Sequence, residues 1–109
     1  MKKDINITEE KSYLNKFDKK IYNKFKKIAK KNNKKFNLFL NLKIEELKDN
    51  IILKKYEENN KYKKKTIHLT EENHRFSKNM FYIHGITIRD YIQSLMEETI
   101  RREKEQPQK

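Results

Sequence analysis

Apolar residues in the first third of the chain recur at helical spacing. Between Thr8 and Lys31 they stand three or four residues apart, so in a helix they would share one stripe while lysines cover the remaining surface. The stripe contains Leu14, Phe17, Ile21, Phe25 and Ile28. Thr8 can cap the first turn, and the acidic residues Glu9 and Glu10 suit its positive end. The pattern predicts a basic amphipathic helix over residues 8–31.

The middle of the chain changes period twice. Residues 36–44 alternate between apolar and polar positions, which is the period of a β-strand, although Phe39 interrupts the polar side. Helical spacing returns over residues 44–56, with acidic residues early and lysines late, as the helix dipole favours. Residues 57–65 are polar and lysine-rich. We expect a short strand, pairing within the first half or at a sheet edge, then a second helix and a linker.

A stretch after residue 64 alternates strictly. Within Lys65–Thr70, Ile67 and Leu69 would lie on one face of a strand, and Thr66 and His68 on the other. This pattern is typical of a short, half-buried strand.

Two helices are predicted after this strand. Thr70 can cap the first, which should end near His84, because Gly85 can adopt the left-handed conformation of a C-cap. Thr87 stands three residues before Asp90, the spacing of a capping box, and predicts the start of the second helix. The apolar face of that helix contains Ile88, Tyr91, Ile92, Leu95, Met96 and Ile100.

The predicted strand has no partner within the C-terminal half of the chain. Its free backbone groups require one, and a second copy of the same strand would supply an antiparallel ribbon. The inner face of that ribbon would carry Ile67 and Leu69, and the outer face Lys64, Thr66 and His68. A two-stranded ribbon is narrow enough to enter the major groove of DNA.

Composition limits what the chain can be. It has 109 residues, 34% hydrophobic and 40% charged, so a unit of under about 60 residues would be marginally stable unless it dimerised. The formal net charge of +12 favours a polyanionic partner such as nucleic acid or an acidic membrane surface, and charge alone does not choose between them. There is no cysteine, and no apolar run approaches the roughly 18 residues of a membrane span. We expect a protein of the bacterial cytoplasm or nucleoid.

The segment from Lys64 to Arg102 resembles the ribbon-helix-helix superfamily, which includes the Met and Arc repressors and small plasmid copy-control repressors. The resemblance is carried by Thr66–Thr70, Glu71 and Glu72 with His74, Met80, Gly85–Thr87, Asp90–Ile92 and Leu95 with Met96. Ser77 departs from it, because the family usually has a bulky apolar residue at that position.

The resemblance implies a mainly α fold with an intertwined dimer. A C-terminal ribbon-helix-helix domain at 64–102 would follow a basic, largely helical extension at 1–60 and a linker at 61–64, and residues 103–109 would form a flexible tail. The dimer core would contain Ile67, Leu69, Met80, Ile83, Ile88, Tyr91, Ile92, Leu95 and Met96.

The resemblance also assigns residues to DNA. Lys64, Thr66 and His68 would contact base edges, since lysine donates to guanine and threonine offers a hydroxyl and a methyl group. The phosphate contacts would come from Lys65, Thr87, Ile88 and Arg89, the last three at a helix N-terminus.

The function expected from these features is sequence-specific binding of double-stranded DNA by a homodimer, as a plasmid or mobile-element transcriptional repressor. A partition protein, a relaxosome accessory protein and an antitoxin-like protein-interaction module are the alternatives, and all three suit an N-terminal extension that engages a protein partner. The strand could instead be an ordinary edge strand, and the basic helix a solvated face. We expect no catalysis, cofactor, metal site or membrane partner, because no such motif is present.

Overall fold

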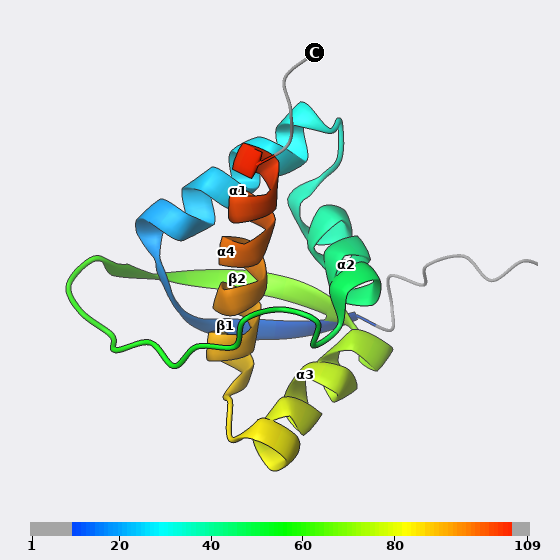
Figure 1. The fold of residues 1–109 in the computed structure, drawn as a ribbon, viewed down its shortest axis with the longest axis vertical. Coiled ribbons are helices and arrows are strands. Elements are labelled where there is room, and N and C mark those ends of the chain that lie inside the picture. Colours follow the sequence, from blue (N-terminus) through cyan, green and yellow to red (C-terminus); the bar gives the residue numbers. More distant parts are fainter. Residues whose placement is uncertain (1–9, 106–109) are drawn as a thin grey trace, which may run out of the picture.

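The structure, a computed structural model, describes residues 10–105. Two strands and four helices follow one another along this part of the chain (Figure 1): β1 Glu10–Asp18, α1 Lys19–Lys31, α2 Phe36–Leu47, β2 Tyr62–Thr70, α3 Glu71–His84 and α4 Ile88–Glu105. The order strand, helix, helix therefore occurs twice. The predicted tail begins within α4, and its residues 106–109 lie outside the described part of the chain.

The two strands of one chain pair with each other. β1 and β2 form an antiparallel two-stranded sheet in which Glu10 is opposite Thr70 and Asp18 is opposite Tyr62. The partner of the predicted strand is thus supplied from the first twenty residues rather than by a second copy. This pairing overturns the expected fold: the chain is not a basic extension followed by a C-terminal ribbon-helix-helix unit that forms its ribbon by intertwining with another chain.

The helix predicted over residues 8–31 is wrong in its first half. Residues 10–18 are extended, and helix α1 begins only after Asp18, whose side chain accepts a hydrogen bond from the Ile21 backbone at 3.0 Å. The step of three from Leu14 to Phe17 fits a helix, but in the strand it places these side chains on opposite faces. The proposed cap at Thr8 lies outside the described residues.

The strand predicted at 36–44 is also wrong, and the helix predicted at 44–56 is helical only as far as Leu47. Helix α2 covers Phe36–Leu47, and its buried positions include Phe39, the residue that broke the alternation. Lys48 ends it with a φ of 51°. Residues 48–61 then cross the face of α4 on the viewer's side of Figure 1, where the Lys54 backbone N–H donates to the Ser94 hydroxyl at 3.0 Å.

The strand and the two helices predicted after residue 64 are confirmed, but β2 begins at Tyr62, so most of the linker predicted at 61–64 belongs to the strand. The Thr70 hydroxyl accepts from the Asn73 backbone, and Gly85 follows α3 with a φ of 71°. The Thr87 hydroxyl accepts from the Asp90 backbone at 3.1 Å and so caps α4.

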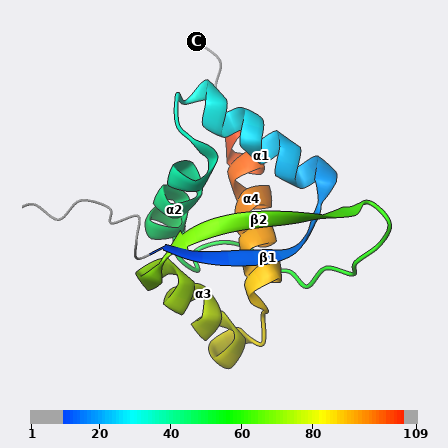
Figure 2. The same ribbon diagram turned by 180° about the vertical axis from the view of Figure 1, so that it is seen from behind.

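Helix α4 lies at the centre of the molecule. It runs behind the two strands in Figure 2, and every residue from Asp90 to Met96 is buried. The core draws on both halves of the chain, combining Phe17, Phe25, Leu40 and Ile44 with Ile67, Tyr91, Leu95 and Met96. Ser77 is fully buried, and its hydroxyl has no hydrogen-bond partner in the described structure. Among residues 10–105, no helix has the length and apolarity needed to cross a membrane.

Candidate nucleic-acid interface

The register of the sheet divides its side chains between two faces. Tyr13 lies opposite Ile67, and this face packs against the core together with Phe17 and Leu69. Successive side chains of a strand point to opposite sides. The other face carries the alternate cross-strand pairs. The three between the end pairs are here called the outer face: Ser12 with His68, Leu14 with Thr66, and Lys16 with Lys64.

The outer face is open to solvent. Figure 2 shows the two strands nearest the viewer, with α4 behind them. Ser12, Lys16, Lys64 and Thr66 are exposed, and Leu14 is 61% exposed although it is a large apolar residue. An exposed face of this kind offers hydroxyl groups, ammonium groups and one apolar side chain along a narrow ribbon.

Two contacts order the ends of the outer face. At one end the Ser12 hydroxyl lies 3.2 Å from the His68 Nδ1, linking the two strands. At the other end Lys16 and Lys64 face each other, and like charges directly opposite on a sheet repel. A carboxylate oxygen of Glu58 lies 3.2 Å from the Lys16 ammonium and offsets part of this repulsion.

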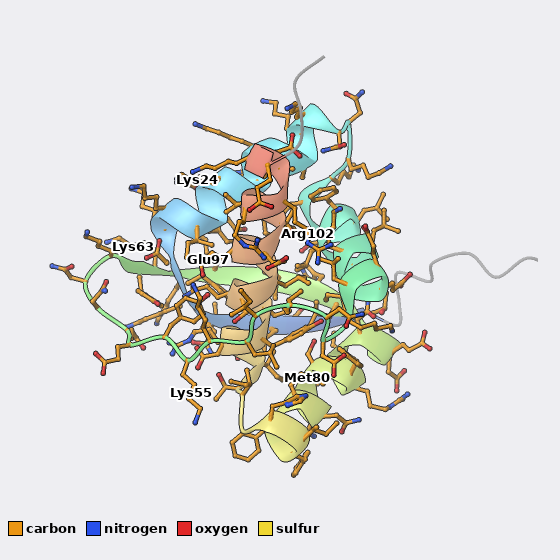
Figure 3. The ribbon with its side chains drawn as sticks, in the orientation of Figure 1. Lys24, Lys55, Lys63, Met80, Glu97 and Arg102 are labelled. Carbon is orange, nitrogen blue, oxygen red and sulfur yellow. The ribbon has the colours of Figure 1, made fainter. Side chains whose placement is uncertain are left out.

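More lysines surround the Lys16 end. Lys63 and Lys65 flank Lys64 on β2, and the Lys19 backbone N–H donates to the Lys61 carbonyl, which brings the start of α1 beside the start of β2. Figure 3 labels Lys63 on the left of the molecule, below Lys24 of α1. Positive charge is therefore concentrated where the ribbon meets α1.

Asparagine side chains fix the free edge of β2. The His68 backbone N–H donates to Asn37 at 3.0 Å, and the Asn41 amide donates to the His68 carbonyl at 3.0 Å. Asn41 also accepts from the Thr70 backbone and from the Asn73 side chain. These bonds occupy the edge that a further strand would need, and they hold β2 against α2 and α3.

A buried glutamine fixes the other end of the ribbon. Gln93 of α4 is fully buried; its carbonyl accepts from the Asp18 backbone and its amide donates to the Tyr62 hydroxyl, both at 2.8 Å. Asp18 and Tyr62 are the last cross-strand pair of the sheet. The ribbon is thus anchored at both ends and presents its outer face in one orientation.

The predicted base-contacting residues share this outer face. Lys64 and Thr66 are exposed and His68 is half-buried, all on the same side of β2. Sequence reasoning missed the residues opposite them on β1, namely Ser12, Leu14 and Lys16. Residues 11–18 carry no regular alternation that could have found them, because Leu14 and Phe17 stand at helical spacing and Asn15 is polar on the inner face.

The predicted phosphate contacts lie elsewhere. The Lys65 ammonium sits 5.1 Å from the centre of the Tyr22 ring, a cation–π contact. Thr87 caps α4, and Ile88 is half-buried against the core. Arg89 is occupied inside the protein, because its guanidinium lies 3.2 Å from Asp90 and 3.3 Å from Glu58.

The residues predicted for the dimer core divide into two groups. Seven of them are buried within this one chain: Ile67, Leu69, Met80, Tyr91, Ile92, Leu95 and Met96. Ile88 is half-buried, and Ile83 is 65% exposed near the end of α3, beside the exposed Phe81 and Tyr82. The apolar stripe of α4 is therefore satisfied without a second copy.

A pocket of about 360 Å³ lies between α1, α4 and the 48–61 connection. Its two carboxylates already have basic partners: Glu97 pairs with Lys54, and Glu98 with Arg101. Glu97, which is labelled in Figure 3, is one of the α4 residues that line this pocket. Within residues 10–105, no group of three or more His, Cys, Asp or Glu side chains could hold a metal ion.

Comparisons with known proteins add no assignment. No protein-family model, no curated protein and no solved structure matches this chain.

Proposed function

We propose that this protein binds double-stranded DNA by inserting the outer face of its intrachain β1–β2 ribbon into the major groove. The observation that carries the proposal is the composition of this face, where Ser12, Lys16, Lys64 and Thr66 are exposed on a ribbon anchored at both ends. The repressor role rests on the resemblance of the C-terminal segment alone.

The groups on the outer face suit base edges. Lysine donates to the O6 and N7 atoms of guanine, and serine and threonine hydroxyls donate or accept. A two-stranded ribbon fits the width of the major groove of B-DNA. Because the strands are held by Asn37, Asn41 and Gln93, the face needs little reordering on binding.

The charge distribution favours a polyanion at this place. Lys16 and Lys64 face each other across the ribbon, and Glu58 offsets only part of their repulsion. A phosphate backbone or a row of guanine acceptors would turn this repulsion into attraction, and would add to the long-range attraction of a chain with a net charge of +12.

To test this proposal, the protein is titrated into a fluorescently labelled, random-sequence duplex at several salt concentrations, and binding is measured by fluorescence anisotropy. Lys64→Ala should weaken binding and lower the slope of log affinity against log salt by about 1. The matched control is Lys55→Ala, since Lys55 is also exposed but lies on the connection that crosses the opposite face of α4. Equal losses of duplex affinity in both variants would show that the ribbon is not the DNA-binding surface.

Two further probes separate DNA from other anions. Vesicles with anionic lipids test a membrane surface, and a single strand of the same length tests general attraction to nucleic acid. The proposal requires the duplex to bind more tightly than either at physiological salt. Stronger binding to the vesicles would contradict it.

A further inference from the structure

The ribbon of this protein is built from two different strands. Across the outer face, Ser12, Leu14 and Lys16 of β1 oppose His68, Thr66 and Lys64 of β2. A ribbon made by two copies of one strand would present the same residues twice, related by a two-fold axis, and would match a palindromic site. Here no such symmetry exists, because each half of the face has its own chemistry.

The surroundings of the strands differ as well. The free edge of β2 is held by Asn37 and Asn41 of α2, whereas the Lys16 end of β1 is bonded to Glu58 of the connection. Helix α4 is buried at the centre, while α2 exposes Leu38 and Leu42. The two strand-helix-helix segments are therefore not equivalent halves.

We propose that a single chain recognises a non-palindromic duplex site, and that Leu14 reads the methyl group of a thymine within it. This inference rests on the proposed function and specifies its substrate. One anchored ribbon already presents a complete outer face, so a second chain is not needed to fill the groove.

Leu14 is the one apolar residue on the outer face, and it lies on β1 opposite a polar residue of β2. It is 61% exposed at the middle of the ribbon, opposite Thr66, with Ser12 and Lys16 as its neighbours on the same face of β1. Isolated exposed leucines are common on proteins and need no explanation by themselves. On a face otherwise made of donors and acceptors, however, its base-edge partner is the thymine C5-methyl, the apolar group of the major groove.

The experiment begins with selection of bound duplexes from a random pool by the full chain. The recovered duplex is then measured for stoichiometry, and each thymine is replaced in turn by uracil, which removes the methyl group and keeps the base pair. We expect one chain per site, an asymmetric consensus, and one position where uracil weakens binding about fourfold, the value of one buried methyl group.

Two variants connect that position to Leu14. In Leu14→Ala the thymine and uracil duplexes should bind equally well at this position. Ile52→Ala is the matched control, since Ile52 is 59% exposed on the 48–61 connection, and it should keep the fourfold difference. Both side chains are exposed, so unchanged thermal unfolding is expected and verifies that the variants fold.

The outcomes distinguish this inference from the function on which it rests. If the chain retains no duplex from the pool, the proposed function and the inference both fail. If it retains duplexes without a common sequence, the inference alone fails. A palindromic consensus bound by two chains overturns the inference alone, and so does a uracil effect that persists in Leu14→Ala. An asymmetric site with a uracil effect that disappears only in Leu14→Ala supports it.

Discussion

The two faces of the β1–β2 ribbon each carry a large aliphatic side chain, but these side chains meet different surroundings. Ile67 on the inner face is fully buried against the core, whereas Leu14, on the outer face of the opposite strand, is 61% exposed. The inner face binds α4 and determines stability. The outer face contributes little to folding, which leaves its residues free to be selected for a partner.

The comparison also shows how the ribbon can be rigid while half of it is exposed. Most of the side-chain contacts that hold it lie at its edge and ends, at Asn41 and Gln93, and the outer face adds the contact between Ser12 and His68. Substitutions can therefore separate folding from binding, and the predictions below are ordered by their expected effect on stability.

The largest effect is expected on the inner face. Ile67→Ala should lower the free energy of unfolding by about 2 to 5 kcal/mol, because it removes a fully buried side chain and leaves a cavity. Leu14→Ala should change it by less than about 0.5 kcal/mol. Urea unfolding followed by circular dichroism measures both, and equal losses would show that the two faces do not differ in burial.

Next in size is the asparagine contact at the edge of β2. Asn41→Ala should cost about 2 to 3 kcal/mol, because the His68 carbonyl and the Thr70 backbone N–H lose their partner in a partly buried environment. Asn79→Ala, at an exposed position of α3, is the control and should be close to neutral. A neutral Asn41→Ala would mean that the edge of β2 is held by something else.

A pH-dependent effect is expected at Glu98 of α4. Burial raises the pKa of this carboxyl, but hydrogen bonds from Arg102 and Arg101 outweigh burial and leave the pKa below its ordinary value. The folded state therefore binds the Glu98 proton less readily than the unfolded chain does. The ionised Glu98 carboxylate stabilises the folded state fully above the ordinary glutamate pKa, and this contribution is lost as the pH falls through the lowered pKa.

Thermal unfolding of Glu98→Gln tests this contribution. The wild-type protein should be the more stable at neutral pH, and the difference between the two proteins should shrink on acidification below the ordinary glutamate pKa. If the difference in unfolding temperature between the two proteins did not change with pH, the charge of the Glu98 carboxylate would not be the cause of it.

The smallest effect on stability belongs to the lysine pair of the outer face. Lys64→Ala should be neutral or slightly stabilising, within about 0.5 kcal/mol, because it removes a like charge opposite Lys16. The same variant is predicted above to weaken duplex binding. A marked loss of thermal stability would contradict the assignment of Lys64 to an exposed face. Weaker duplex binding by this variant would then reflect unfolding and not the loss of a contact.

Local signals in the C-terminal half predicted its elements well. The caps at Thr70 and Thr87 and the left-handed Gly85 each depend on neighbouring residues only, and all three are present. The outward position of Lys64 and Thr66 also follows from the alternation of the strand itself.

The errors came from two ambiguities of period and one long-range pairing. Leu14 and Phe17 fit a helix by spacing but belong to a strand, and Phe39, which seemed to disturb a strand, is a buried residue of helix α2. The partner of His68 on the ribbon is Ser12, 56 residues away. No local pattern encodes that pairing, so an intermolecular partner was inferred where the chain supplies its own.

The intrachain ribbon is tested most directly by a cross-strand disulfide. The chain has no cysteine of its own. The backbone groups of His68 bond to α2 and not to β1, so His68 and Ser12 form a closely spaced, non-hydrogen-bonded pair, and so do Thr66 and Leu14 two residues along. Their Cα atoms are about 4.5 Å apart, within the range that a disulfide can bridge. On mild oxidation, the Leu14→Cys, Thr66→Cys double variant should form a bond within one chain and keep the monomer mass in non-reducing electrophoresis. Formation of a covalent dimer at low protein concentration, with no intrachain bond, would contradict the fold and the function proposed from it.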